Sequence, residues 1–290
     1  MQILINIIIN SALFILISYS FSIIYYSTRF FNMTHATVFT CSAYFAYLFL
    51  VQLSFPIYLS VLLGIVCAAI VGILCEVVIY RPLQKRGASS MILMIASLGL
   101  YIVLQNVISV AWGDDTKSIR SGDIKAGYEI LGAYITKTQI VTVAICLFII
   151  VVCIFFMRHS RIGRNIRAIA TNQELSNIIG IDSNKIILLA FCIGSVLIAI
   201  SGLLVAFDRD MIPTMGFKWL LYGIVSMIIG GVGSTWGLVG GAFLLATAQH
   251  VGAYFIGSQW MDAIAYIILI LFLIVRPLGF SGKLLKKTEI

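Results

Sequence analysis

Few side chains in this sequence are of types that could take part in catalysis, and most of them lie within long apolar runs. Glu76 precedes Arg81 by five residues, which favours a structural ion pair over a proton-binding carboxylate. Ser234 and His250 are residue types that hydrolases use, but Val232 stands where a nucleophile turn requires glycine. The spacing therefore predicts no intramembrane serine protease.

Motifs that would supply energy are also missing from the sequence. The phosphate-binding pattern GxxxxGK[ST] does not occur, so we expect no ATP hydrolysis by that route. Few acidic residues lie inside the apolar spans, namely Glu76 and, near a span start, Asp262, whereas an ion-driven carrier relies on intramembrane carboxylates. His35 and His250 lack the spacing of metal ligands and are expected to pack or hydrogen-bond. We expect neither an enzyme nor a metal-binding or cofactor-binding chain.

Two segments interrupt the apolar runs, one in each half of the chain. The first is segment 31–35, which includes Asn32 and His35, and the second is the glycine-rich segment 230–241. Paired interruptions indicate the central site of a transporter, because unwound backbone can line a polar cavity. We therefore interpret both segments as parts of a substrate pathway.

The glycine-rich segment has two compatible interpretations. Gly231, Gly233 and Ser234 are pathway candidates if the backbone unwinds there. The spacing Gly233-xxx-Gly237-xxx-Gly241 is also typical of helices that pack closely. The sequence alone does not decide between unwound backbone and close helix packing.

Gln105 and Asn106 are neighbouring amides within an apolar span. Facing lipid would cost free energy, so they should face other helices or a cavity. We include both among the pathway candidates.

Composition identifies an integral membrane protein. The chain is 61% hydrophobic and 10% charged, against roughly 25% charged in soluble domains. Its net charge is +8, but the basic residues gather in segments 81–86, 158–185 and 276–287, which are not a nucleic-acid footprint. The polar loop 113–138 has four basic and four acidic residues. This asymmetry places the three basic segments in the cytoplasm.

The apolar runs predict an all-α, polytopic helical membrane protein with eight or nine transmembrane helices, broken in each half. We expect one transmembrane domain over 1–290, with the N-terminus outside, retained as a span, and the C-terminus cytoplasmic. The expected spans are 3–25, 37–53, 57–80, 91–112, 139–157, 186–207, 217–233, 237–256 and 260–275.

The cytoplasmic segment 158–185 is a polar island with helix signals. Thr171 and Glu174 have the spacing of a capping box, which predicts a helix start. Gly180 is suited to a left-handed helix stop. A short helix outside the bilayer would dock a soluble partner, although a solvated loop that only follows the charge rule is equally compatible.

Five segments in series resemble the permease subunits of ATP-binding-cassette importers for branched-chain amino acids. They span about four-fifths of the chain, and the topology is similar to that of the shorter of the two paired subunits. The segments are FFNMTHATVFTCSAYFAY (30–47), EVVIYRPL (76–83), LQN (104–106), SRIGRNIRAIATNQELSNIIGI (160–181) and IIGGVGSTWGLVGGAF (228–243).

The sequence departs from the family pattern at several positions. The N-F-A-H-G segment has Met33, Thr34 and Ala36 as replacements. Ser176 replaces an alanine usual in the cytoplasmic segment, and Trp236 replaces a proline or similar residue. The bulky tryptophan bears on the size of the substrate.

The resemblance implies a complex of several protein chains. Two permease subunits, here expected to be related but different, would form the pathway in the bacterial inner membrane, surrounded by lipid. Two cytoplasmic ATPases would bind ATP and Mg, and an extracytoplasmic binding protein would deliver substrate. This binding protein would face loop 113–138 and stretch 208–218. Nucleic acid is not an expected partner.

The resemblance also implies residue roles. ATPase docking is expected at Arg164, Arg167, Glu174 and Gly180. The substrate pathway is expected at Asn32, His35, Gln105, Asn106, Gly231, Gly233 and Ser234. Branched-chain amino acids are the implied substrates, with urea, short amides or other amino acids as alternatives, and a self-contained facilitator or channel as the competing class.

Overall fold

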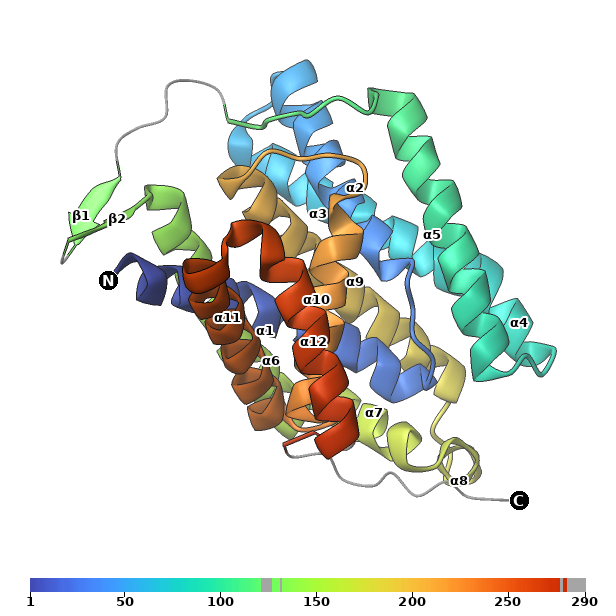
Figure 1. The fold of residues 1–290 in the computed structure, drawn as a ribbon. Helices are drawn as coiled ribbons and strands as arrows, with labels where there is room; N and C mark the ends of the chain where they lie inside the picture. Colours follow the sequence, from blue (N-terminus) through green and yellow to red (C-terminus); the bar gives the residue numbers. More distant parts are fainter. Residues whose placement is uncertain (121–126, 131, 277–278, 281–290) are drawn as a thin grey trace. The chain divides into compact units, whose positions relative to one another are not determined.

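The computed structural model describes residues 1–120, 127–130, 132–276 and 279–280 and is almost entirely helical (Figure 1). The helices are α1 (Gln2–Thr28), α2 (His35–Tyr47), α3 (Ile57–Cys75), α4 (Arg81–Lys85), α5 (Ser90–Trp112), α6 (Lys137–His159), α7 (Arg161–Thr171), α8 (Gln173–Ile178), α9 (Ser183–Asp208), α10 (Met215–Gly230), α11 (Thr235–Ile256) and α12 (Met261–Val275). Two π-helical turns, Leu48–Gln52 and Glu76–Tyr80, follow α2 and α3, and a 3₁₀ turn, Ser258–Trp260, precedes α12.

Each of the nine expected spans contains a helix, which confirms a polytopic helical membrane protein. Within the described residues, seven segments are long and apolar enough to cross a membrane. The other two are short: α10 has 16 residues, and α2 has 13 residues before its π-helical turn. These short helices adjoin the two interruptions, as expected for broken helices.

The first helix, α1, is buried along most of its length, with 94% of its most apolar window inside the chain. Its serines are compatible with this burial because their hydroxyls bond to the helix backbone. Ser18 Oγ donates to the Ile15 carbonyl at 3.0 Å, and Ser27 Oγ donates to the Ile24 carbonyl at 2.9 Å. These two buried hydroxyls are therefore satisfied within their own helix.

The chain divides into two compact units, with unit 1 comprising 1–22, 124–164 and 221–290, and unit 2 comprising 23–123 and 165–220. In unit 2, α2, α3 and α9 pack on one another (Figure 1). Small residues bring these helices together. A Cβ atom at Gly64 would lie 3.2 Å from the Ala46 Cβ, and one at Gly202 would meet the Phe39 carbonyl.

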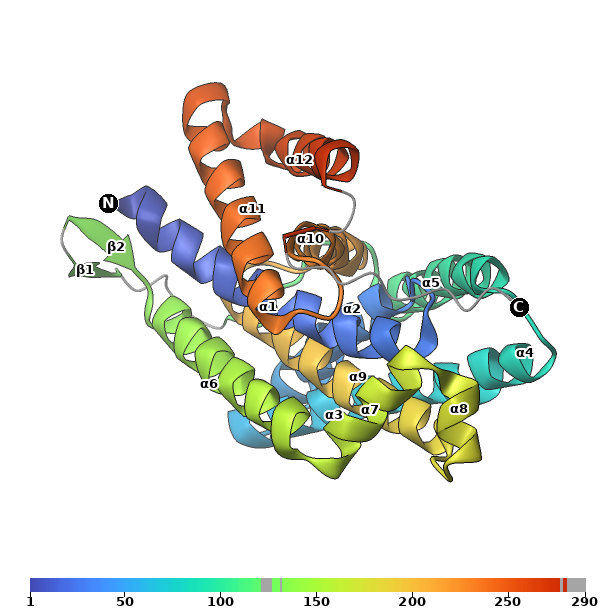
Figure 2. The ribbon, with the colours of Figure 1, turned by 90° about the horizontal axis from the view of Figure 1, so that it is seen from below.

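In unit 1, α11 and α12 pack together and are joined by the 3₁₀ turn (Figure 2). A small antiparallel hairpin, β1 (Tyr128–Ile130) and β2 (Ala133–Ile135), pairs Tyr128 with Ile135. The Gln2 side chain ties α1 to this hairpin. Its Oε1 accepts from the Tyr134 N–H at 2.9 Å, and its Nε2 donates to the Tyr134 carbonyl at 3.1 Å.

Candidate functional sites

A buried polar network stabilises the first interruption, between α1 and α2. Tyr80 donates its hydroxyl hydrogen bond to Asn32 Oδ1 at 2.9 Å, and its oxygen lies 2.6 Å from Thr34 Oγ1. Thr34 Oγ1 donates to the Ser97 carbonyl at 2.8 Å. All four residues are at most 3% exposed. We call Asn32, Thr34, Tyr80 and Ser97 the break network.

Ser97 also satisfies the unwound backbone of this interruption. The Met33 N–H donates to Ser97 Oγ at 3.0 Å, and Ser97 Oγ lies 3.1 Å from the Phe31 carbonyl. Irregular backbone at membrane depth requires such partners from the protein. A side chain of α5 therefore supplies hydrogen bonds that the helix would otherwise provide.

Asn32 and His35, both pathway candidates, lie inside unit 2. His35 is the first residue of α2 and is 1% exposed. Its backbone N–H donates to the Asn32 carbonyl at 3.3 Å. Asn32 was a pathway candidate from the sequence. Its hydrogen-bond partner Tyr80 was not, although Tyr80 belongs to the motif EVVIYRPL.

The expected ion pair between Glu76 and Arg81 is not formed, and this expectation was wrong. Glu76 is 1% exposed, and its Oε2 has no hydrogen-bond partner. No arginine nitrogen approaches this carboxylate within ion-pair distance in the described chain. The two residues bracket a π-helical turn, in which the Arg81 N–H bonds the Glu76 carbonyl. The local geometry thus joins their backbones and not their side chains.

The second interruption lies between α10 and α11. The glycine-rich segment here contains both unwound backbone and closely packed helix. Gly231 and Gly233 have φ of 91° and 87°, a left-handed conformation that favours glycine. Ser234 caps α11, its Oγ accepting from the Gly237 N–H at 3.1 Å. A Cβ atom at Gly241 would lie 2.7 Å from the Gly230 nitrogen. The backbone therefore turns at the first glycines and packs closely at the later ones.

A contact at the end of α12 was not foreseen from the sequence. The Phe280 N–H donates to the Ile229 carbonyl at 2.9 Å. A Cβ atom at Gly279, which has φ of 68°, would lie 2.7 Å from the Gly231 Cα. The chain after α12 therefore contacts the second interruption within unit 1.

The two amides of α5 are accessible. Gln105 is partly exposed and Asn106 is exposed, among exposed apolar neighbours such as Val107. The Asn106 amide nitrogen donates to the Ile102 carbonyl of its own helix at 2.8 Å. A polar group on a membrane-embedded surface costs free energy against lipid. This face of α5 therefore favours a covering that is polar or aqueous.

Segment 158–185, which we expect in the cytoplasm, contains two short helices, α7 and α8, instead of one. In α7, Arg161, Arg164 and Arg167 are exposed at three-residue intervals, whereas Ile166 and Ile169 are buried. This alternation is typical of an amphipathic surface helix. The spacing of arginines and isoleucines in the sequence fits this helix, which precedes the helix expected after Thr171.

The expected capping box at Thr171 was wrong. Thr171 is the last residue of α7, and its Oγ1 donates to the Arg167 carbonyl at 3.0 Å. Asn172 is the cap of α8, its Oδ1 accepting from the Leu175 N–H at 3.0 Å. Asparagine is among the best N-cap residues, and it lies one position nearer to the helix.

Gly180 ends α8 as expected, with φ of 89°. The Ile181 N–H bonds the Ser176 carbonyl at 2.9 Å and the Gly180 N–H bonds the Asn177 carbonyl at 3.1 Å. This pair of bonds defines a Schellman motif. Ile178 and Ile179 remain 81% and 66% exposed on the same short helix. An apolar, rigidly ended surface is therefore presented outside the spans.

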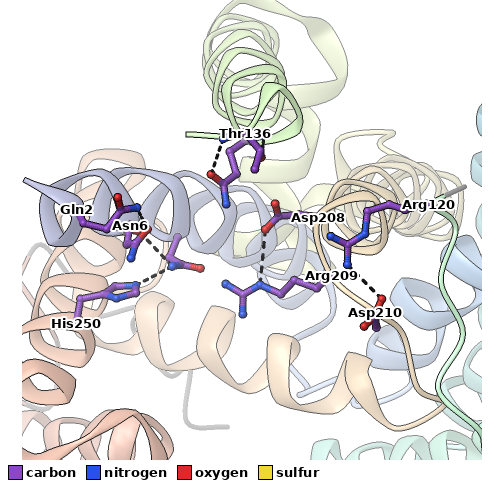
Figure 3. A network of polar contacts seen from close by, with 10 residues as sticks. Gln2, Asn6, Arg120, Thr136, Asp208, Arg209, Asp210 and His250 are labelled. Atoms are coloured by element: carbon purple, nitrogen blue, oxygen red, sulfur yellow. Dashed lines mark hydrogen bonds and ion pairs between the residues drawn. The ribbon is translucent and has the colours of Figure 1, made fainter. Parts of the chain in front are cut away.

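The polar loop 113–138 lies partly outside the described residues. Where it is described, it contacts the stretch after α9 (Figure 3). Lys117 and Met211 exchange backbone hydrogen bonds of 2.9 and 2.8 Å, and Arg120 pairs with Asp210 at 3.1 Å. The two segments that we expect to face a binding protein thus meet within unit 2.

In unit 1, His250 forms a hydrogen bond between two helices. Its Nε2 lies 2.7 Å from Asn10 Nδ2, which joins α11 to α1 (Figure 3). This bond agrees with the packing or hydrogen-bonding role expected for this histidine.

Long apolar helices, two glycine- or polar-lined interruptions and an exposed amphipathic element define the class of polytopic membrane permeases. The chain belongs to the family described as branched-chain amino acid transport system / permease component, whose model matches residues 3–273. This family assignment confirms the resemblance found in the sequence.

Individual relatives are similar over nearly the whole chain. The high-affinity branched-chain amino acid transport system permease protein BraD of Pseudomonas aeruginosa is 30% identical, covering 98% of this chain and 96% of the relative. The permease protein LivH of Escherichia coli is 28% identical, covering 92% and 91%. A chain of PsaBC from Streptococcus pneumoniae, solved in complex with Fab, has a TM-score of 0.52 at 12% identity, covering 96% of this chain and 93% of that chain. The last likeness supports the fold alone.

Proposed function

We propose that this chain is one permease subunit of an ATP-driven importer and that its substrates are branched-chain amino acids. The substrate class is supported by the names of BraD and LivH, which span almost the same length. A second, related permease would complete the pathway, and an extracytoplasmic protein would deliver substrate. The N-terminus would lie outside the inner membrane and the C-terminus in the cytoplasm.

One observation carries the ATP-driven part of the proposal: α7 exposes three arginines, and two isoleucines at the end of the following helix α8 are exposed as well. Ile178 and Ile179 are too apolar to be left in water without a partner, and Gly180 ends their helix rigidly. Arg164, Arg167 and Glu174 are also exposed. Exposed apolar side chains together with charged ones are typical of a protein interface. The partner would be an ATPase, which would bind ATP and Mg, while this chain would have no catalytic site of its own.

The pathway would use the two interruptions and the α5 face. The exposed Asn106 supports this role directly, because a polar surface at membrane depth requires a polar partner. Gly231, Gly233 and Ser234 would provide unwound backbone at the second interruption. The buried Asn32 and His35 would act from within the first interruption.

Co-purification with the ATPase tests the docking assignment. We expect the double variant Arg167→Glu, Glu174→Arg to lose the ATPase, whereas Arg86→Glu, an exposed cytoplasmic control outside the segment, should retain it. Retention of the ATPase at normal stoichiometry by the double variant would contradict the assignment.

Transport by the assembled complex tests the substrate class. With its binding protein in nanodiscs, we expect leucine or valine to stimulate ATP hydrolysis more than glutamate or urea does. Stimulation only by urea or glutamate would contradict branched-chain amino acids as the substrates. Uptake by this chain alone, without nucleotide, would favour a facilitator.

A further inference from the structure

Arg29 links the end of α1 to the end of α7 within unit 2. Its guanidinium donates a hydrogen bond to the carbonyl oxygen of Ala170, the next-to-last residue of α7. Carbonyls of a last helical turn lack partners in the helix and form the negative end of its dipole. Ala170 is 2% exposed, so water has little access to this residue. A charged donor is therefore a strong partner for this carbonyl.

The backbone of Arg29 is strained. Its φ is 60°, and its N–H bonds the Tyr25 carbonyl at 2.8 Å, closing α1. A residue with a side chain adopts this conformation only where its surroundings fix it. On the following residue, the buried Phe30 ring lies 5.1 Å from the Tyr80 ring. The bend is thus fixed by the guanidinium on one side and by Phe30 on the other.

From this bend the chain enters the break network directly. Asn32 and Thr34 bond Tyr80, and Thr34 bonds Ser97 on α5. Asn106 follows Ser97 by nine residues on the same helix, or about 13 Å along its axis. The Arg29 bond and the break network, joined by the backbone of residues 29–32, therefore connect the end of α7 with α5.

We propose that Arg29 is a positioning residue that transmits movement of the docking helices to the first interruption and to α5. Because its bond fixes the end of α7 to the end of α1, a displacement of α7 carries the bend and the break network with it. The inference rests on the proposed function, since ATPase binding at α7 and α8 is the source of the displacement.

The coupling ratio, substrate imported per ATP hydrolysed, tests this role in proteoliposomes that contain the complete complex. Arg29→Gln removes the guanidinium, and we expect the ratio to fall about fivefold or more, the usual lower range of an allosteric coupling. Arg86→Gln removes the same charge from an exposed position and should leave the ratio unchanged. Arg29→Lys keeps a charged donor and should restore part of the ratio, which a defect in folding alone would not predict.

A second measurement keeps Arg29 in place. Nitroxide labels at Thr28→Cys and Thr171→Cys flank the bonded pair, and we expect their separation to stay constant through the nucleotide cycle. A change of separation on ATP binding, or an unchanged ratio in Arg29→Gln, would overturn the inference. Failure of the unaltered chain to retain any ATPase would instead contradict the proposed function.

Discussion

Tyr80 and Asn32, 48 positions apart in the sequence, share a buried hydrogen bond of 2.9 Å. Tyr80 ends a π-helical turn, and Asn32 lies in the interruption after α1. π-Helical turns are frequent at functional sites because they shift the register of a helix by one residue. Here the π-helical turn ends at Tyr80, whose hydroxyl bonds Asn32 in the interruption. The segments EVVIYRPL and FFNMTHATVFTCSAYFAY are therefore joined by a buried hydrogen bond.

Removal of the Tyr80 hydroxyl should destabilise the protein. Tyr80→Phe leaves Asn32 Oδ1 without this donor in a site that is at most 3% exposed. An unsatisfied buried polar group costs about 1–3 kcal/mol. We expect a lower midpoint of thermal denaturation in detergent.

Tyr101→Phe is the matched control, because the Tyr101 hydroxyl has no hydrogen bond to any described residue, while its ring centroid lies 5.1 Å from that of Phe217. Equal denaturation midpoints for the two variants would show that the break network contributes nothing to stability.

Close packing at the second interruption predicts different costs for two glycines of α11. A Cβ atom at Gly237 would overlap the Gly230 carbonyl, whereas one at Gly240 meets nothing within 4 Å. Gly237→Ala should therefore destabilise by about 1–3 kcal/mol, as overpacking does. Gly240→Ala should be neutral or slightly stabilising, because alanine has the higher helix propensity. Denaturation of both variants in detergent measures the difference, and similar midpoints would contradict the packing.

The exposed amide of Asn106 predicts an effect on transport without an effect on assembly. Asn106→Leu removes one neutral hydrogen-bonding group, worth about 1 kcal/mol or a roughly fivefold decrease in uptake. Val107→Leu alters an exposed apolar neighbour and should transport normally. Uptake into proteoliposomes is the measurement, with ATPase recovery as the check on assembly. Normal uptake by Asn106→Leu would exclude this amide from the pathway.

The cap of α9 predicts a dependence on acid. The Lys185 backbone N–H, and then the Lys185 side chain, lower the pKa of Asp182 from its usual 3.8. Since the pKa is lower in the folded state, the stabilisation is fully present above pH 3.8 and is lost as the pH falls towards the folded pKa. Asp182→Asn keeps a capping oxygen without this titration. We expect its stability to vary less with pH below that value, and identical acid denaturation curves would contradict this.

Local features of this protein could be predicted from the sequence. The nine spans were identifiable because a membrane requires long uninterrupted apolar runs. The stop at Gly180 was identifiable because left-handed backbone favours glycine. The class of transporter followed from motifs in series, whereas the helix α7 was missed because its buried residues, such as Ile166 and Ile169, alternate with arginines and lack the apolar length of a span.

Only the tertiary structure decided which side chains meet. Glu76 and Arg81 suggested a local ion pair, but they form none within the described chain, and Tyr80 of the same π-helical turn bonds Asn32. The Arg29 bond to Ala170 likewise joins residues 141 positions apart. Such contacts depend on how helices pack, and helix packing is set by the fit of many side chains together. Apolar length and a single glycine act within a few residues, so the sequence by itself determined the spans and the stop, but not these pairs.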